Sequence, residues 1–307
     1  MTRIFIDGKA GTTGLRLAER LQGRKDLEIL SLPEEQRKDP GARAEMLNAA
    51  DIAFLCLPDA AAAEAAGMVR NDHTVIIDTS TAHRVNPDWC YGMPELPGQR
   101  ENIRKSPKIA NPGCHASGFI ALVAPLREAG LLSADARLSC FSLTGYSGGG
   151  KKMIGEYEAE TLPPLYQAPR QYALGQTHKH LPEMAKYCAL EHAPVFCPIV
   201  APYYAGMEVT VPLTPGETGA SIEEIREVYR KAYASGLIRF AEAPDEGGFL
   251  SAEALAGRDS MEISVFGNPE RMLLTARFDN LGKGASGAAI QNMNIVLGLD
   301  EKEGLTE

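Results

Sequence analysis

Hydrophobic and polar positions follow a regular rhythm over the first third of the chain. Short apolar runs of strand length alternate with stretches of helical spacing, and Pro58 stops the third run. The apolar runs are residues 3–6, 27–32, 51–57 and 74–78, and the helical stretches are residues 15–21, 43–50 and 60–69. Strands that alternate with helices predict an α/β fold with a doubly wound parallel sheet of the Rossmann type.

The pattern changes after residue 113. A helix-like run, residues 116–126, precedes longer β-rich runs at residues 137–143, 195–200, 207–211, 261–265 and 272–278. Ser221-Ile-Glu-Glu224 is a capping box and predicts a helix that continues to Tyr233. We therefore expect two domains: residues 1–113, completed by a C-terminal helix, residues 281–307, and an α+β domain over residues 114–280.

Composition narrows the function. The chain carries 31 Lys and Arg against 40 Asp and Glu, a net charge of −9, which argues against nucleic-acid or anionic-membrane binding. The six cysteines form no C-x-x-C pair, so a structural zinc site is not expected. The sequence shows no signal-peptide pattern and no apolar run of membrane-spanning length, so we expect a cytoplasmic protein.

A glycine-rich turn directly follows the first predicted strand. Its sequence, Gly8-Lys-Ala-Gly11-Thr12-Thr13-Gly14, opens a predicted helix. Glycines permit a tight turn and let the backbone approach a pyrophosphate at the helix N-terminus. The G-x-x-G-x-x-G spacing favours dinucleotide binding by these residues, with a purely structural strand-to-helix turn as the alternative.

The end of the second strand bears on the choice between NAD and NADP. NAD sites usually place an acidic residue there to bind the ribose hydroxyls. This chain has Ser31 at that point, and Arg37 and Lys38 follow shortly. A hydroxyl and two cations suit a 2′-phosphate and favour NADP(H). Glu34 and Glu35 oppose this interpretation, and a solvated turn explains the two cations equally well.

Cys114 is the strongest candidate for a catalytic residue. It follows the turn Asn111-Pro-Gly113 and precedes the helix-like run. The positive end of a helix dipole favours the thiolate, which is the form that attacks carbonyl carbon. A buried, inert thiol is the alternative. A nucleophilic cysteine beside a nicotinamide cofactor indicates chemistry that interconverts acyl groups and aldehydes.

The segment His178-Lys-His180-Leu-Pro-Glu183 supplies candidates for the base. A histidine can accept and return a proton near pH 7, and a carboxylate such as Glu183 can orient it. The H-x-H pattern also occurs in metal sites, but no third ligand is apparent, so no metal is expected. Polar surface histidines are the remaining alternative.

The loop Gly145-Tyr-Ser147-Gly148-Gly-Gly-Lys151-Lys152 ends a predicted strand. Such a loop can bring backbone N–H groups and cations to an anion. A flexible hairpin would explain it equally well.

Two other positions are candidates for ligand contacts. Ser80 and Arg84 follow the fourth strand, at the edge where open α/β sheets bind ligands, and Arg84 can clamp a phosphate or carboxylate. Asn280 precedes the terminal helix and is a candidate to hold a carboxamide.

Together these motifs resemble the N-acetyl-gamma-glutamyl-phosphate reductase family, in its shorter (type 2) branch. The matching segments lie in the same order over nearly the whole chain: Gly8–Gly14, Asp78–Arg84, Asn111–Cys114, His178–Glu183 and Asp279–Asn292. The resemblance implies NADPH-dependent reduction of N-acetyl-L-glutamyl 5-phosphate to N-acetyl-L-glutamate 5-semialdehyde and phosphate in arginine biosynthesis. It also implies a homo-oligomer, a dimer or tetramer, with NADP bound by the first domain and catalysis and oligomerisation in the second.

The resemblance also assigns roles to residues. It makes Cys114 the nucleophile that forms a thioester intermediate. It places the base in the histidine pair, with His180 preferred over His178, and makes Glu183 its supporting carboxylate. His115 stands where many longer relatives carry tyrosine. The expected phosphate or carboxylate contacts are Arg84, Lys151, Lys152 and Ser147, and the cofactor is expected along Gly8–Gly14 and near Ser80, Ser147, Gly148 and Asn280.

Three alternatives remain from the sequence. Aspartate-semialdehyde dehydrogenase and a lysine-pathway aminoadipyl-phosphate reductase share the cysteine chemistry and differ in the acyl pocket. A non-catalytic NADP-binding regulator keeps the fold, but it requires neither Cys114, His180 nor Arg84.

Overall fold

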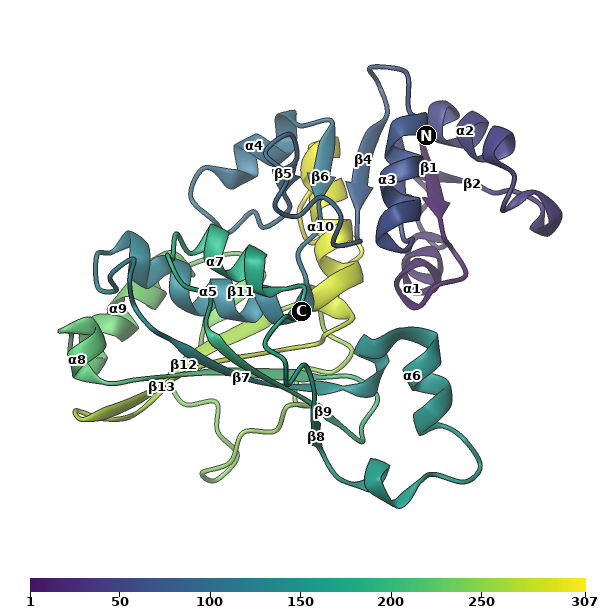
Figure 1. Cartoon of the computed structure of the whole chain (residues 1–307). Coiled ribbons are helices and arrows are strands. Elements are labelled where there is room, and N and C mark those ends of the chain that lie inside the picture. Colours follow the sequence, from purple (N-terminus) through teal and green to yellow (C-terminus); the bar gives the residue numbers. More distant parts are fainter. The chain divides into compact units, whose positions relative to one another are not determined.

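The computed structural model describes residues 1–307 and divides into two compact units (Figure 1). Unit 1 comprises Met1–Pro112 and Ala285–Leu305, and unit 2 comprises Gly113–Gly284 with Thr306–Glu307. All the helices are too short or too polar to traverse a bilayer.

Unit 1 contains a six-stranded sheet in the order β2-β1-β3-β4-β6-β5, and every pairing in it is parallel. The predicted doubly wound sheet is therefore confirmed. Its strands are β1 (Thr2–Asp7), β2 (Leu27–Leu30), β3 (Ile52–Leu55), β4 (Val75–Asp78), β5 (Cys90–Tyr91) and β6 (Lys108–Ala110).

Helices cover both faces of this sheet, because its strands are apolar on both sides. Ile4 and Ile6 of β1 belong to the core on one face, and Phe5 belongs to the core on the other. The first face carries α1 (Thr12–Leu21), α4 (Gln99–Lys105) and α10 (Gly287–Leu297), and the second carries α2 (Pro40–Ala49) and α3 (Asp59–Met68). The short 3-10 helix η1 (Glu34–Gln36) follows β2.

Unit 2 contains a seven-stranded mixed sheet in the order β11-β12-β13-β10-β7-β9-β8. The strands are β7 (Ser139–Gly145), β8 (Arg170–Gln171), β9 (Val195–Ala201), β10 (Met207–Leu213), β11 (Ile238–Phe240), β12 (Met261–Asn268) and β13 (Arg271–Phe278). One face is covered by α5 (Cys114–Glu128) and α9 (Ile222–Ala232), and α7 (Leu181–Tyr187) packs on α5 (Figure 1). The remaining helices are α6 (Gly150–Tyr157), α8 (Pro215–Thr218) and the 3-10 helices η2 (Tyr146–Gly149) and η3 (Pro164–Gln167).

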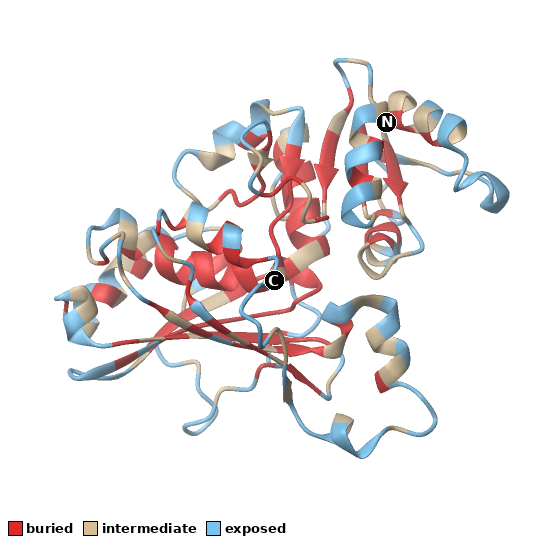
Figure 2. Ribbon diagram, viewed as in Figure 1, coloured by how far each residue is buried: buried red, intermediate tan, exposed pale blue.

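Helix α5 is buried along most of its length, as Figure 2 shows. A Cβ at Gly118 would lie 2.6 Å from Val209 Cγ2, so this glycine lets α5 approach β10 closely. Pro125 lies inside the helix and has no N–H to donate to the Ala121 carbonyl. The hydroxyl of Tyr233 donates to that carbonyl instead, at 2.6 Å, so the helix continues past its proline without a stranded acceptor.

The sequence predicted most long elements but misplaced several boundaries. The capping box at Ser221 is present and opens α9. The second strand ends at Leu30 instead of residue 32, and the terminal helix begins at Gly287 instead of residue 281, because a π-helical turn, η4 (Gly282–Ser286), precedes it. Helices α4, α6, α7 and α8 and strands β5, β6, β8 and β11 were missed; each is eight residues or shorter, too short for a periodic signal.

Candidate active site

The glycine-rich turn after β1 depends on its glycines for space. Gly8 has a φ of +86°, and a Cβ there would lie 2.3 Å from the Cys56 carbonyl oxygen. A Cβ at Gly14 would lie 2.5 Å from the Gly8 carbonyl oxygen. Gly11 is the N-cap of α1 and supplies no capping side chain, and the buried Thr12 hydroxyl has no hydrogen-bond partner. Uncapped amides and an unpartnered hydroxyl fit an anionic group such as a pyrophosphate.

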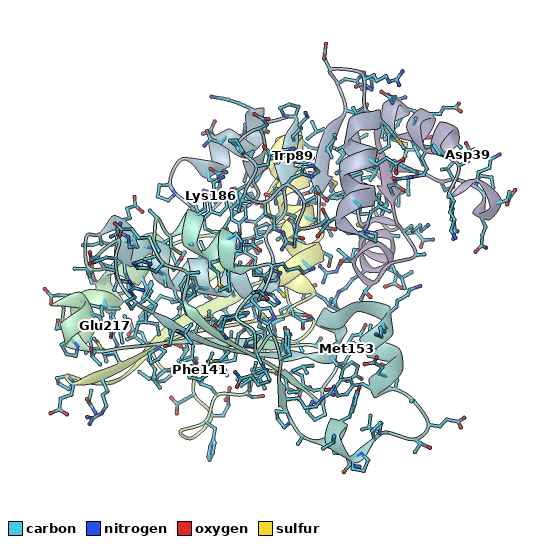
Figure 3. All side chains as sticks on the ribbon, in the orientation of Figure 1. Asp39, Trp89, Phe141, Met153, Lys186 and Glu217 are labelled. Atoms are coloured by element: carbon cyan, nitrogen blue, oxygen red, sulfur yellow. The ribbon has the colours of Figure 1, made fainter.

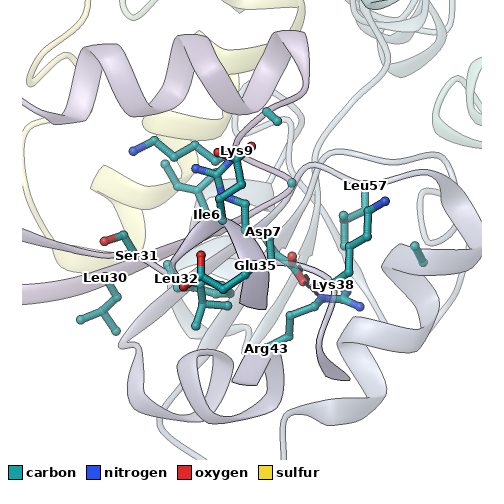
Figure 4. A pocket seen from close by; sticks show the side chains of 16 residues that line it. Ile6, Asp7, Lys9, Leu30, Ser31, Leu32, Glu35, Lys38, Arg43 and Leu57 are labelled. Carbon is teal, nitrogen blue, oxygen red and sulfur yellow. Dashed lines mark hydrogen bonds and ion pairs between the residues drawn. The ribbon is translucent and has the colours of Figure 1, made fainter. Parts of the chain in front are cut away.

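A pocket of about 690 Å³ opens beside this turn (Figure 4). Four of the predicted cofactor residues line it: Gly8, Ser31, Arg37 and Lys38. Gly11, Thr12, Thr13 and Gly14 lie in the first turns of α1 instead. Ser80 is elsewhere in unit 1, in the loop after β4.

The charges around the pocket are partly paired with one another. The buried Arg43 donates Nε and Nη2 to the Asp7 carboxylate at 3.1 and 2.9 Å. Arg37 lies 3.7 Å from Glu34. Lys38 and Lys9 also line the pocket and form no ion pair. These two lysines are therefore cations of the pocket lining that no carboxylate of the chain neutralises.

The loop after β4 is organised by one buried carboxylate. Asp78 accepts the Ser80 hydroxyl at 2.8 Å, and its Oδ2 lies 2.6 Å from His83 Nδ1. The His83 ring stacks on Trp89 with 3.9 Å between centroids (Trp89 is labelled in Figure 3). Both oxygens of Asp78 are thus engaged within this loop.

Arg84, in the same loop, is also buried. Its Nε donates to the Asn111 carbonyl at 2.9 Å, and its Nη2 donates to the Thr79 carbonyl at 3.0 Å. Two of its donors therefore hold backbone, including the turn that leads to Cys114.

In unit 2, Cys114 is the first residue of the 15-residue helix α5, and Gly113 is its N-cap. The thiol is partly exposed and forms no disulfide. A Cβ at Gly284 would lie 2.9 Å from Cys114 Cβ, so only glycine fits beside the thiol there. A helix N-terminus with no capping side chain places the thiol at the positive end of the dipole.

Glu183, on α7, connects the cysteine turn to the histidine pair. Its Oε2 accepts the N–H of Gly113 at 3.1 Å, and its Oε1 lies 4.0 Å from His180 Nε2. The side chain is almost fully buried. One carboxylate therefore holds the residue before the nucleophile and faces the ring of a candidate base.

The two candidate bases differ in their surroundings. His178 Nδ1 accepts the backbone N–H of His180 at 3.1 Å, so neutral His178 carries its proton on Nε2. Their ring centroids are 4.7 Å apart. Because Nδ1 of His178 is engaged as an acceptor and Nε2 of His180 faces a carboxylate, the arrangement favours His180 as the base.

His115 is enclosed in the same cluster. Its Nδ1 lies 2.7 Å from Ser142 Oγ and its Nε2 lies 2.7 Å from the Tyr172 hydroxyl. Burial, with a smaller contribution from His178, lowers the pKa of His115 from 6.5 to about 3. Burial also raises the pKa of Tyr172, and a negative charge on Cys114 raises it further. His115 is therefore a neutral bridge, and Tyr172 lies within electrostatic reach of the thiol.

The segment after β7 forms helix instead of the alternative hairpin. Ser147 lies in η2, and its Oγ accepts the Asn280 side-chain N–H at 3.0 Å; Gly148 lies beside the same amide. Asn280 also accepts the Gly206 N–H at 2.9 Å, so it holds this loop in place. Lys151 and Lys152 lie exposed in the first turn of α6, with Lys152 4.0 Å from Glu156.

Several residues of the site were missed from the sequence. Lys9 and Arg43 line the nucleotide-side pocket, and Gly284 and Tyr172 lie near the thiol. Only the repeated glycines at 282, 284 and 287 gave a signal for Gly284. No group of three His, Cys, Asp or Glu side chains is arranged to hold a metal ion.

Two family models match the chain. One is described as the NAD binding domain of semialdehyde dehydrogenase and matches residues 3–106. The other is described as the semialdehyde dehydrogenase dimerisation domain and matches residues 114–280.

Solved structures share the fold at low sequence identity. Aspartate semialdehyde dehydrogenase II of Vibrio cholerae superposes with a TM-score of 0.74 at 17% identity, covering 97% of this chain and 98% of that one. The Candida albicans aspartate semialdehyde dehydrogenase, described as solved with NADP, has a TM-score of 0.67 at 16% identity, covering 97% of this chain and 98% of that one.

Curated relatives are much more similar in sequence. The N-acetyl-gamma-glutamyl-phosphate reductase of Brucella canis is 47% identical, covering 96% of this chain and 99% of that protein. The protein of the same name from Brucella anthropi is 48% identical, covering 96% of this chain and 98% of that protein. The chain therefore belongs to the N-acetyl-gamma-glutamyl-phosphate reductase family and has the two-domain organisation of the semialdehyde dehydrogenases.

Proposed function

We propose that the protein reduces N-acetyl-L-glutamyl 5-phosphate with NADPH to N-acetyl-L-glutamate 5-semialdehyde and phosphate, a step of arginine biosynthesis. The observation that carries this proposal is the shared carboxylate of Glu183, which holds the Gly113 amide and faces His180. A cysteine at a helix start and a histidine facing the same carboxylate are the parts that acyl transfer to sulfur requires. The 47% identical relatives carry the name of this activity.

The reaction begins at Cys114 in this proposal. The thiolate attacks the acyl carbon, and the C–S bond forms as the carbonyl becomes a tetrahedral oxyanion. The oxyanion collapses, and the C–O bond to phosphate breaks with its electron pair on the leaving phosphate. A thioester remains on Cys114. Amides at the start of α5 are candidates to stabilise the oxyanion, but that of Gly113 is bonded to Glu183.

His180 carries out the proton transfers in this proposal. NADPH, when bound, supplies the hydride that converts the thioester to a thiohemiacetal. His180 donates the proton that the resulting oxyanion needs and removes it as the thiohemiacetal collapses, when the C–S bond breaks and the thiolate returns. Glu183 orients His180 and stabilises its protonated form. His178 and the neutral His115 position the substrate and the imidazole ring of His180.

The remaining candidate residues are proposed to contact either the anionic groups of the substrate or the cofactor. Lys151, Lys152, Ser147 and Arg84 are proposed for the departing phosphate or the substrate carboxylate. Gly8, Gly11, Thr12, Thr13 and Gly14 are proposed for the pyrophosphate, with Ser31, Arg37 and Lys38 at the 2′-phosphate and Ser80, Gly148 and Asn280 toward the nicotinamide. Unit 1 is thus the NADP-binding domain, and unit 2 is the catalytic and oligomerisation domain. We place the reaction in the cytoplasm, since all six cysteines are free thiols, as in a reducing compartment.

The open face of the unit 2 sheet is the proposed subunit interface. Phe141 pairs with Thr210, which pairs with Thr275, so these residues share one face, opposite the face that packs on α5. Phe141 is 42% exposed and Leu273, on the same face, 44%. A sheet face with exposed large apolar side chains suits association with a second copy. The dimerisation-domain match covers the same residues.

The first test is substrate choice. With NADP and phosphate, N-acetyl-L-glutamate semialdehyde should be oxidised and aspartate semialdehyde should not. Cys114→Ser should lose turnover by about 1,000-fold or more while keeping its affinity for NADPH. Cys90→Ser is the matched control and should stay within about twofold of wild type, because Cys90 lies in β5 of unit 1 and serine can still accept the Gln99 side-chain N–H. Near-normal turnover of Cys114→Ser would contradict the mechanism.

A second test concerns the cofactor phosphate. Lys38→Ala should raise the Kd for NADPH about tenfold, because a charge-assisted contact to a phosphate is lost. The Kd for NADH should change little. Titration of cofactor fluorescence measures both constants. The control is Lys25→Ala, an exposed lysine just before β2, which should change neither value. Equal weakening of NADPH and NADH would argue against a 2′-phosphate contact.

A third test is oligomeric state. The wild-type chain should sediment as a dimer or larger, and Phe141→Asp should sediment as a monomer, because a carboxylate would be desolvated in the proposed interface. Leu15→Asp, at a position of similar exposure (47%) on α1, should leave the mass unchanged. A monomeric wild type, or an unchanged mass for Phe141→Asp, would rule out this interface.

A fourth test uses the depressed pKa of His115. Its pKa in the folded protein, about 3, lies below the ordinary 6.5, so the unfolded chain binds this proton first as the pH falls. The contribution of neutral His115 to the free energy of unfolding is complete above pH 6.5. It is lost between pH 6.5 and about 3, with a slope up to about 1.4 kcal/mol per pH unit. Denaturant unfolding of His115→Gln should show a shallower loss over this window. His73→Gln, at an exposed site, should follow wild type; identical slopes for His115→Gln and wild type would refute the interpretation.

A further inference from the structure

The chain that leads to Cys114 is held in unit 1 by a buried network of side-chain amides that the mechanism above does not use. Asn111, 1% exposed, has all four of its polar groups bonded. Its backbone N–H donates to the Asp78 carbonyl at 2.7 Å, and its carbonyl accepts Arg84 Nε at 2.9 Å. Its side-chain Nδ2 donates to the Ala285 carbonyl at 3.0 Å, and its Oδ1 accepts Asn292 Nδ2 at 3.1 Å.

Asn292, on α10, joins three segments through one amide group. Besides Asn111, its Nδ2 donates to the Gly92 carbonyl at 2.9 Å. A Cβ at residue 92 would lie 2.4 Å from that nitrogen, so glycine is required for the approach. The residue after β5, the residue after β6 and helix α10 are therefore tied at a single point.

Only the donor end of the Asn292 side chain forms hydrogen bonds. Residue 292 is fully buried, and its Oδ1 accepts no hydrogen bond. A buried amide oxygen without a donor is unfavourable relative to an apolar side chain of the same shape. The donor end of the side chain therefore supplies what an apolar residue cannot, which is a fixed orientation for the Asn111 amide.

We propose that Asn292 is a positioning residue for the reaction at Cys114. By orienting Asn111 it sets the direction in which Pro112 and Gly113 lead into α5. Pro112 has a restricted φ, which transmits that direction with little loss. On the unit 2 side, Glu183 holds the Gly113 N–H. The backbone before the nucleophile is thus anchored at the residue on each side of Pro112, and a misplacement of about 1 Å at a reacting group can lower a rate 100-fold.

The inference rests on the proposed function only through the role of Cys114 as nucleophile. Its test compares Asn292→Leu with Asn294→Leu. Asn294 is on the same helix and is equally buried, but it accepts from Arg24 and donates to the carbonyls of Glu301 and Glu303. It thus anchors the C-terminal tail and has no bond to Asn111. Both variants remove a buried amide, so both should lower the unfolding temperature.

Only Asn292→Leu should change the chemistry. We expect kcat to fall about 10- to 100-fold, with the Kd for NADPH and the KM for the acyl phosphate within about twofold of wild type. The rate at which iodoacetamide alkylates Cys114, followed on the peptide by mass spectrometry, should also change. Asn294→Leu should keep kcat and the alkylation rate within about twofold of wild type.

The inference is overturned if the two variants lower kcat equally, or if Asn292→Leu leaves kcat and alkylation unchanged. If Asn292→Leu does not fold, Gly92→Ala replaces it, since its methyl group displaces the Asn292 amide without removing it, and the same outcomes apply. Failure of the proposed function has a separate signature: wild type without the activity, or an active Cys114→Ser.

Discussion

The turn from Asn111 to Cys114 is the constraint on which the site depends. Pro112 has no N–H, so the turn offers two backbone donors before α5 begins, those of Asn111 and Gly113. The first is bonded to Asp78 in unit 1 and the second to Glu183 in unit 2. Both donors are therefore bonded, each within its own unit. Within unit 2, the thiol is placed by the start of α5 and by the bond between Glu183 and the N–H of the residue before it.

The fold of unit 1 was predictable because its strands are buried on both faces. Such strands are continuous apolar runs, and β1, β3 and β4 were recognised as such. The capping box at Ser221 identified the start of α9 for a local reason. By contrast, α7 has only seven residues and α6 starts within a run of glycines, so neither gives a periodic signal. Their helical state depends on tertiary contacts.

The candidate site was predictable as chemistry but not as geometry. The residue types of Cys114, His178, His180 and Glu183 were enough to suggest a nucleophile, a base and a carboxylate. The bond between Gly113 and Glu183 joins residues 70 positions apart, and no spacing rule foresees it. His115 was noted only as a departure from longer relatives, yet its contacts with Ser142 and Tyr172 make it a neutral part of the site. Such pairings arise when strands and helices from distant parts of the sequence meet.

The proline inside α5 has a consequence for how this sequence can change. Pro125 leaves the Ala121 carbonyl without its helical donor, and the hydroxyl of Tyr233, the C-cap of α9, replaces that donor. The order in which these two residues are substituted therefore matters. Loss of the tyrosine hydroxyl while the proline remains leaves a buried acceptor without a donor, whereas loss of the proline first restores the helical N–H, so the Ala121 carbonyl no longer depends on the hydroxyl. Of the two single-step paths away from this pair, the one that begins at the proline avoids the stranded carbonyl.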